Sequence, residues 1–175
     1  KINTNDRTWL GSDNPKFIGG LNLSCSYKGF DLNMFFNGMI RDAYNNSKYY
    51  TDLFQCWTGN HSTRLLDAMN AYQSFESTGY YDCKTPALTT LNTNNEDQLS
   101  EFYIENGSYI KLKTLTLGYT LPQTLLNKLS LHTARVYLQA QNVFTITGYT
   151  GADPEVLGYS YPLPRTYSFG VSFGF

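Results

Sequence analysis

Two groups of residues have types and spacings that could support hydrolytic chemistry. The five residues from Gly170 to Gly174, with Ser172 at their centre, carry the letters of a hydrolase nucleophile motif. That motif needs a strand, a sharp turn and a helix, whereas this run lies inside an alternating apolar pattern, so we reject it. Asp153 and Glu155 could form the carboxylate pair of a glycoside hydrolase. They stand two residues apart on a proline-containing loop, and we interpret them as a loop-structuring motif.

The remaining reactive residues give no catalytic or metal constellation either. The two histidines, His61 and His132, form no triad and no HExxH pattern, and both are expected in exposed loops. No CxxC pair occurs among the three cysteines, so a structural zinc site has little support. The sequence therefore predicts a protein that is not an enzyme.

The cysteines do allow one covalent prediction. Cys56 and Cys83 fall within one polar stretch, and in an oxidising compartment they could close a loop of about 28 residues, which would contribute roughly 3 kcal/mol. The alternative is a pair of unrelated thiols. Cys25 lies on the apolar phase of a predicted strand, where we expect a small hydrophobic side chain facing lipid or a core.

Composition limits the classes of protein that could position these residues. The 175 residues include 13 Lys plus Arg and 14 Asp plus Glu, so the net charge of -1 predicts no nucleic-acid surface. Charged residues make up 15%, below the roughly 25% of a typical soluble domain. Aromatic residues reach 16%, which argues against disorder. No run of 18 apolar residues occurs, which excludes a membrane-spanning helix. The chain is rich in Tyr, Phe, Asn, Thr, Ser and Gly, a composition typical of all-β structure.

Alternation of apolar and polar residues predicts five strands, at about 16–27, 30–40, 107–119, 134–146 and 165–175. Lys28 and Gly29 are predicted to form a tight hairpin turn. A phase change near Lys113 and Thr114 indicates a bulge, or a strand that passes from an aqueous to an apolar environment. Residues 123–131 are predicted to form one or two helical turns. The stretch of about 41–106 has no sustained period, so we expect a long loop that is functional or packed on something outside the chain.

Two architectures fit this alternation, a soluble sandwich and a membrane barrel. The polar phases carry Asn, Ser, Gly and Gln with little charge, and the apolar phases carry aromatics near the strand ends, as the girdles of a barrel require. Short turns alternate with long loops, which is the outer-membrane layout. Five strands cannot close a barrel, since bacterial barrels have an even number of at least 8. We therefore expect the C-terminal segment of a larger barrel, whose last strand ends in Phe175.

Several motifs in this order resemble one transporter family. The segments that show this resemblance are 107–122, 135–144, 153–155, 161–165 and the last strand, together with residues 6–17 and 27–31 upstream. In this order they resemble the C-terminal barrel of SusC/RagA-type TonB-dependent transporters over nearly all of residues 1–175 except the variable loop. The resemblance implies an antiparallel transmembrane β-barrel of about 22 strands with long extracellular loops, whose plug domain is absent from this chain.

The resemblance also implies a function and partners. Such a transporter is expected in the outer membrane of Bacteroidetes-type bacteria, where it imports oligosaccharides or peptides with a SusD-like lipoprotein as its lid. TonB would supply energy through the absent plug. The alternative is a secreted carbohydrate-binding β-sandwich module. Neither view predicts an organic cofactor.

Candidate binding residues follow from this interpretation. Loop and lumen aromatics can stack on sugars, and the alternative is that each one packs the loop or contacts the lid. These candidates are Tyr49, Tyr50, Trp57, Tyr72, Tyr80, Tyr81 and Tyr149. Residues 1–6 resemble the second half of an EF-hand-type calcium loop, with Lys1 giving a carbonyl, Asn3 a direct or water-mediated contact and Asp6 the closing carboxylate. The alternative there is an ordinary hydrophilic loop.

Overall fold

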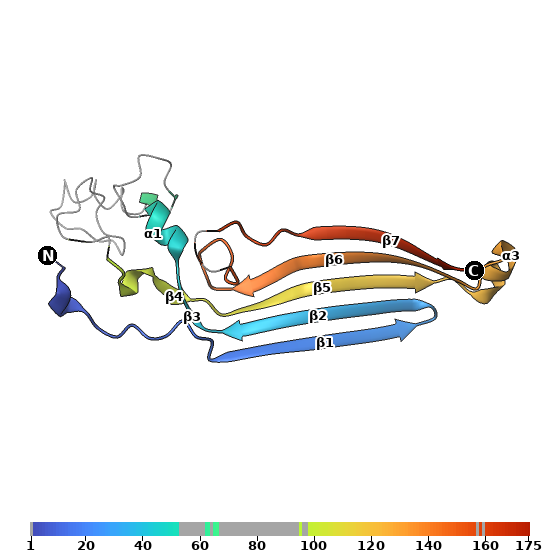
Figure 1. Cartoon of the computed structure of the whole chain (residues 1–175), viewed down its shortest axis with the longest axis horizontal. Coiled ribbons are helices and arrows are strands. Elements are labelled where there is room, and N and C mark those ends of the chain that lie inside the picture. Colours follow the sequence, from blue (N-terminus) through green and yellow to red (C-terminus); the bar gives the residue numbers. More distant parts are fainter. Residues whose placement is uncertain are drawn as a thin grey trace.

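The computed structural model describes residues 2–52, 62–63, 65–66, 95, 98–156, 158 and 160–175. Five long strands form one antiparallel sheet and lie side by side along the molecule (Figure 1). In the spatial order of the sheet they are β1 (Phe17–Tyr27), β2 (Phe30–Ile40), β5 (Tyr109–Thr120), β6 (Thr133–Thr147) and β7 (Thr166–Gly174). The predicted all-β antiparallel fold is confirmed.

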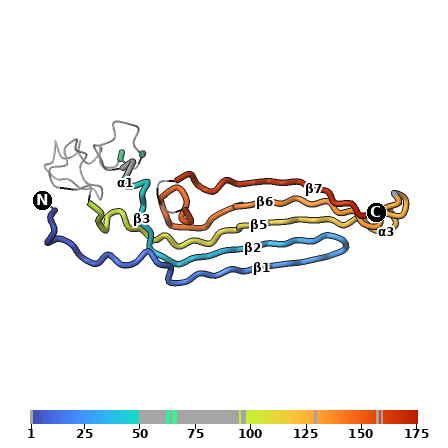
Figure 2. Tube along the Cα trace, viewed as in Figure 1, coloured from blue at the N-terminus to red at the C-terminus, as the bar shows by residue number. Residues whose placement is uncertain are grey.

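Short connections gather at one end of the sheet, which we call the turn end. Lys28 and Gly29 have φ angles of 47° and 89°, so both occupy the left-handed region that a two-residue hairpin turn of type I′ requires. The helix α3 (Gln123–Leu129) connects β5 to β6 and buries Leu126. The C-terminus lies at this end and the N-terminus beyond the other end (Figure 2).

Long connections gather at the opposite end, which we call the loop end. Here β3 (Asp42–Tyr44) pairs with β4 (Ile104–Asn106). Along the chain, α1 (Asn46–Asp52) follows β3 and the 3-10 turn η2 (Glu101–Tyr103) precedes β4, whereas the 3-10 turn η1 (Thr4–Asp6) lies near the N-terminus. The long loop expected over 41–106 therefore carries short strands and a helix at its ends, which the sequence pattern did not predict. Three-residue strands are too short to show alternation, and their partners lie about 60 residues apart in sequence.

The pairing registers sort the side chains of the sheet onto two faces of opposite character, because directly paired residues share a face. We call the first the apolar face. Its members are Phe17, Gly19, Leu21, Leu23, Cys25 and Tyr27 of β1, Phe30, Leu32, Met34, Phe36, Gly38 and Ile40 of β2, Ile110, Leu112, Leu115, Leu117 and Tyr119 of β5, Ala134, Val136, Leu138, Ala140, Phe144 and Ile146 of β6, and Tyr167, Phe169, Val171 and Phe173 of β7. The predicted position of Cys25 on the apolar phase agrees with this register.

The other surface of the sheet is the polar face. It carries short uncharged side chains along most of its length, among them Asn22, Ser24, Asn33, Thr116, Gln139, Gln141, Ser168 and Ser172. The apolar side chains of Ile18, Phe35 and Met39 interrupt this face nearer the loop end, and the rings of Tyr109 and Tyr137 also lie on it. Among the described residues no second sheet packs on either face, as the sandwich alternative would require.

A bulge keeps β5 in phase with its neighbours. Phe36 pairs with Leu112 and Phe35 with Thr114, so Lys113 is an extra residue on β5. Because of this extra residue, Leu112 and Leu115 both reach the apolar face although they stand three positions apart. The predicted bulge is confirmed.

Burial is concentrated at the loop end rather than along the sheet. Tyr103, Asn45 and Lys111 are the largest fully buried side chains among the described residues. Most large side chains of the apolar face are exposed, as Phe169 (69%) and Leu138 (57%) illustrate. No helix in the described part of the chain is long and apolar enough to cross a membrane.

Candidate functional site at the loop end

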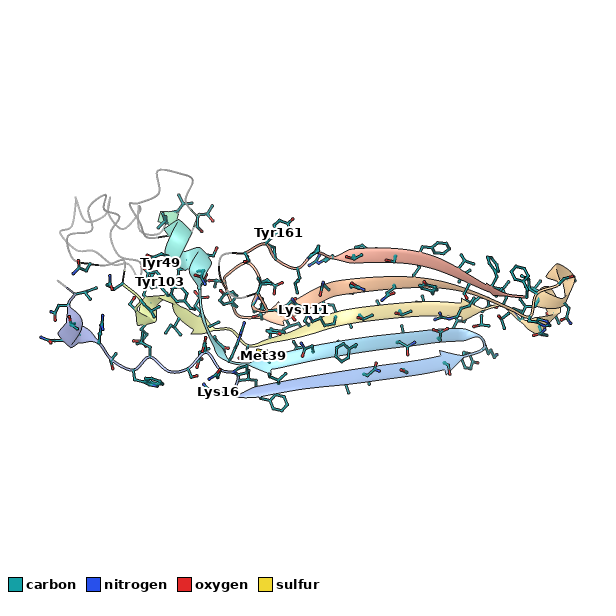
Figure 3. All side chains as sticks on the ribbon, in the orientation of Figure 1. Lys16, Met39, Tyr49, Tyr103, Lys111 and Tyr161 are labelled. Carbon is teal, nitrogen blue, oxygen red and sulfur yellow. The ribbon has the colours of Figure 1, made fainter. Side chains whose placement is uncertain are left out.

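A buried ion-pair cluster ties the β6–β7 loop to the polar face of β5. Lys111 donates to both carboxylate oxygens of Asp153, at 3.0 and 3.1 Å, and to Glu155 at 2.9 Å. Lys113 donates to the second oxygen of Glu155. The Lys111 side chain is only 2% exposed, so it is one of the least accessible charges described (Figure 3 labels it at the start of β5).

The bulge and the loop sequence together build this cluster. Lys111 and Lys113 stand two apart on β5, and Asp153 and Glu155 stand two apart on the loop. Asp153 also accepts backbone N–H bonds from Glu155 (3.0 Å) and Leu163 (3.3 Å), which closes the loop on itself. The interpretation of these two acids as a loop-structuring pair agrees with this geometry.

The environment of the two loop carboxylates favours their charged forms. Burial opposes ionisation of Asp153, but the N–H of Glu155 and the ammonium of Lys111 outweigh it and hold the pKa of Asp153 below its ordinary value. Burial likewise opposes ionisation of Glu155, and the bonds from Lys113 and Lys111 hold its pKa below the ordinary value. A general acid needs a raised pKa, so neither carboxyl is suited to that role.

Further contacts hold the same loop against the β2–β5 connection. Arg41 donates to the carbonyl of Pro154, and Tyr149 donates its hydroxyl to the carbonyl of Tyr44 at 3.3 Å. Thr150 bonds Glu105 through its amide (3.0 Å) and its hydroxyl (2.8 and 2.9 Å). The loop is therefore fixed over the end of the polar face and does not extend away from it.

A pocket of about 360 Å³ lies between this loop and α1. Its walls are Ser47, Tyr149, Ala152, Asp153, Val156, Gly158, Ser160, Tyr161 and Pro162. Tyr161 is 86% exposed and offers an aromatic face, and hydroxyl groups supply hydrogen-bonding capacity (Figure 3). Such a mixture of aromatic and hydroxyl groups suits a neutral polar ligand.

The structure places the predicted binding aromatics in different settings. Tyr149 lines the pocket. Tyr49 instead joins an aromatic cluster, in which its ring centroid lies 5.4 Å from that of the fully buried Tyr103 and 6.3 Å from that of Tyr44. Tyr50 lies in α1. The other four candidates, Trp57, Tyr72, Tyr80 and Tyr81, and the predicted disulfide partners Cys56 and Cys83 lie outside the described residues.

The predicted calcium-loop residues form a local cap. Asn3 accepts from the N–H of Asn5 at 2.8 Å, and Asp6 accepts from the N–H of Asn3 at 2.7 Å, so the two side chains cap η1 reciprocally. Lys1 lies outside the described residues. One carboxylate and one amide fall short of the six to eight oxygens that calcium takes, so a site here would need oxygens from residues beyond these.

A second ion pair lies on the polar face near the turn end. Arg135 of β6 binds Asp31 of β2 through two bonds, Nε at 3.0 Å and Nη2 at 2.6 Å, and so reaches across β5. The residue beneath the pair is Gly118, where a Cβ would collide with both side chains. Ser172, the centre of the rejected nucleophile motif, pairs with Arg135 inside continuous strand β7.

Sequence reasoning did not predict the charged partners in the Lys111 ion-pair cluster or in the Arg135–Asp31 ion pair. Lys111 and Lys113 fall on the polar phase of a strand at the same spacing as the two loop acids, and this matched spacing was the available signal. Arg41 lies between β2 and β3, and Tyr103 belongs to the three-residue turn η2, so neither stands in a periodic segment that would mark it as buried.

Comparison with known proteins gives relatives of one kind. No protein-family model matches the chain. The TonB-dependent receptor P3 of Formosa agariphila is 34% identical over 191 residues, covering 100% of this chain and 18% of the relative. The TonB-dependent receptor SusC of Bacteroides thetaiotaomicron is 30% identical over 161 residues, covering 89% and 15%.

Solved structures agree with the sequence matches. The RagAB peptide importer in its closed-closed state superposes with a TM-score of 0.72 at 30% identity, covering 93% of this chain and 17% of that chain. Its open-open state gives a TM-score of 0.68 and covers 94% and 18%. The chain thus spans less than a fifth of the length of these proteins.

Proposed function

We propose, from the confirmed resemblance of this chain to the C-terminal barrel segment of SusC/RagA-type TonB-dependent outer-membrane transporters, that it forms part of the wall of an outer-membrane nutrient importer. The observation that carries this proposal is the sorting of the sheet into an apolar and a polar face. That sorting persists through all four strand pairs.

The two faces suit the two environments of a barrel wall. A spanning sheet must satisfy its backbone within a closed barrel and must present apolar side chains to lipid and polar ones to the lumen. The apolar face would meet lipid and the polar face would line the path of the nutrient. The loop end, which carries the longer connections, would face the cell exterior. Strands outside this chain would complete a barrel of about 22 strands.

We propose oligosaccharides or peptides as the cargo, with a SusD-like lipoprotein as lid and with TonB acting through a plug outside this chain. SusC and P3 are named as TonB-dependent receptors, and RagAB is described as a peptide importer, which supports this choice. The pocket beside Tyr149 and Tyr161 is the described part of the path best suited to contact cargo, because its walls combine aromatic faces with hydroxyl groups. Tyr49, Tyr50 and the candidates outside the described residues remain proposed contacts.

Uptake by cells tests this function. In a deletion strain, the full-length gene should restore uptake of a fluorescent oligosaccharide or peptide set, and a protonophore should abolish it. Tyr161→Ala should reduce uptake severalfold without changing the amount of protein in the outer membrane. Tyr27→Ala, which removes another exposed tyrosine (68%) at the turn end of the apolar face, is the matched control. Equal uptake by the deletion and complemented strains would contradict the proposal.

Calcium at residues 1–6 is a separate proposal that rests on the resemblance of this segment to a calcium loop. Titration of the full-length protein with calcium, followed by protease protection of the first residues of this segment, tests it. Asp6→Asn should weaken the protection at least tenfold, while Asp13→Asn, in the same exposed segment, should not. Protection that is independent of calcium in the wild type would exclude the site.

A further inference from the structure

The apolar face is interrupted at the loop end by a shallow groove of about 570 Å³. Its side-chain walls belong to the apolar face, and the backbone of adjoining residues completes its floor. The residues that line it are Phe17, Gly19, Gly20, Leu21, Leu23, Phe36, Asn37, Gly38, Met39, Ile40, Tyr109 and Ile110. In Figure 3 the labels Lys16, directly before β1, and Met39, near the end of β2, mark the level of the groove.

Two glycines that face each other across β1 and β2 create the groove. Gly19 pairs directly with Gly38, so both strands lack a side chain at the same level of the apolar face. Glycine within a strand weakens it and often marks a place where another group approaches the backbone closely. The ring of Phe17 leans over Gly19, where a Cβ would come within 2.8 Å of it. Bulky side chains remain at the neighbouring levels of the same face, in the pairs Phe17–Ile40 and Leu21–Phe36.

The position of the groove determines what can enter it. It is continuous with the apolar face, most of whose large side chains are exposed. Just beyond it, the exposed ion pair of Lys16 and Asp42 (3.0 Å, side chains 67% and 44% exposed) marks the level at which charges reach water. The groove therefore begins directly inside the apolar layer at the loop end, where the outer-leaflet chains of a membrane would lie.

We propose that this groove holds one acyl chain of an outer-leaflet lipid. The inference rests on the membrane placement given under the proposed function. A hydrocarbon chain matches the apolar walls and needs no hydrogen-bonding partner from them. Inside the bilayer the chain is already out of water, so each CH₂ group that fills the void contributes to binding through dispersion contacts. A second copy of the protein, or another membrane protein seated on the same glycines, is the competing occupant.

Filling the groove tests the proposal. At Gly38 an added Cβ would lie 3.4 Å from the Tyr109 carbonyl oxygen and 3.6 Å from Ile110 Cγ1, so the backbone tolerates a side chain there. Gly38→Leu would occupy the groove. Ala140→Leu, which adds similar bulk to the apolar face outside the groove, is the matched control.

The readout is the number of lipids that the full-length protein retains. The detergent-purified protein is incubated with phosphatidylethanolamine vesicles, re-extracted, and weighed by native mass spectrometry. Wild type and Ala140→Leu should each retain one lipid more than Gly38→Leu. Equal counts in all three would overturn the proposal, and so would a change in oligomeric state with an unchanged lipid count.

Two further measurements keep the result interpretable. If Gly38→Leu fails to fold, Gly38→Ala with a tryptophan at Ile110 replaces it. In the wild-type background brominated phosphatidylethanolamine should quench that tryptophan to saturation near one lipid per protein, and in Gly38→Ala the saturation should be lost. Unchanged saturation would overturn the proposal. Absence of the wild-type protein from the membrane fraction would refute the proposed function itself, which separates the two failures.

Discussion

The buried cation Lys111 provides the sharpest test of how the β6–β7 loop is held. Lys111→Met would remove both bonds to Asp153 and the bond to Glu155 while preserving the length of the side chain. Breaking a buried ion pair typically costs 3–5 kcal/mol, because it leaves an uncompensated charge. Asp153 would keep its two backbone N–H donors, so we expect the loop to be destabilised by the lower limit of this range, about 3 kcal/mol. At about 1.4 kcal/mol per tenfold change, this cost raises the equilibrium constant for opening of the loop roughly 10²-fold.

Hydrogen exchange in the full-length protein measures this effect. Exchange over residues 148–164 should accelerate roughly 10²-fold in Lys111→Met. Lys16→Met, which breaks the exposed pair with Asp42, should change exchange by about fivefold at most, since such pairs contribute about 1 kcal/mol or less. The double variant Lys111→Met with Asp153→Asn should recover most of the loss because no unpaired charge remains. Equal exchange in Lys111→Met and Lys16→Met would refute the reasoning.

Three further predictions concern pH, packing and covalent structure. The pKa values of Asp153 and Glu155 are held below their ordinary values of 3.8 and 4.5, so their contribution to stability is complete above those values and is lost as the pH falls through the lowered ones. Spin-label distances between the loop and β5 should therefore be constant from pH 7 to 5 and lengthen towards pH 3; a constant distance would contradict this. Tyr103→Ala should lower local stability at the loop end by about 3–5 kcal/mol, seen as faster proteolysis there, whereas unchanged proteolysis would show that the aromatic cluster is dispensable. If Cys56 and Cys83 form the predicted disulfide, they should react with an alkylating reagent only after reduction; labelling without reductant would exclude the bond.

The sheet was predictable because its signal is local and periodic. Every apolar phase seen in the sequence from Leu21 to Phe173 reaches one face, and the phase break near Lys113 marks a bulge that keeps it so. The paired lysines and acids of the loop cluster were individually visible. Their contact was not, because it depends on a loop that turns back over β5 some 40 residues later in the sequence.

The parts that sequence reasoning missed depend on non-local contacts. Strands β3 and β4 each have three residues and pair across about 60 positions, so no window of sequence contains both. Tyr49 has the character of a surface binding aromatic in sequence but packs beside the buried Tyr103. In the sequence Gly118 looks like any glycine of a strand. The structure shows why a side chain would not fit there, because Arg135 crosses directly over it to reach Asp31.

The most direct test of the central claim is the environment of adjacent residues on one strand. Single cysteines at Leu32 and Asn33, in a full-length protein whose native cysteines are replaced, would carry spin labels in a lipid bilayer. The directly paired Leu117 and Thr116 on β5 serve as an independent repeat. The account predicts that labels at the two leucine positions collide with oxygen dissolved in lipid, and that labels at Asn33 and Thr116 collide with a water-soluble nickel reagent. Equal aqueous access at all four positions would contradict the barrel wall.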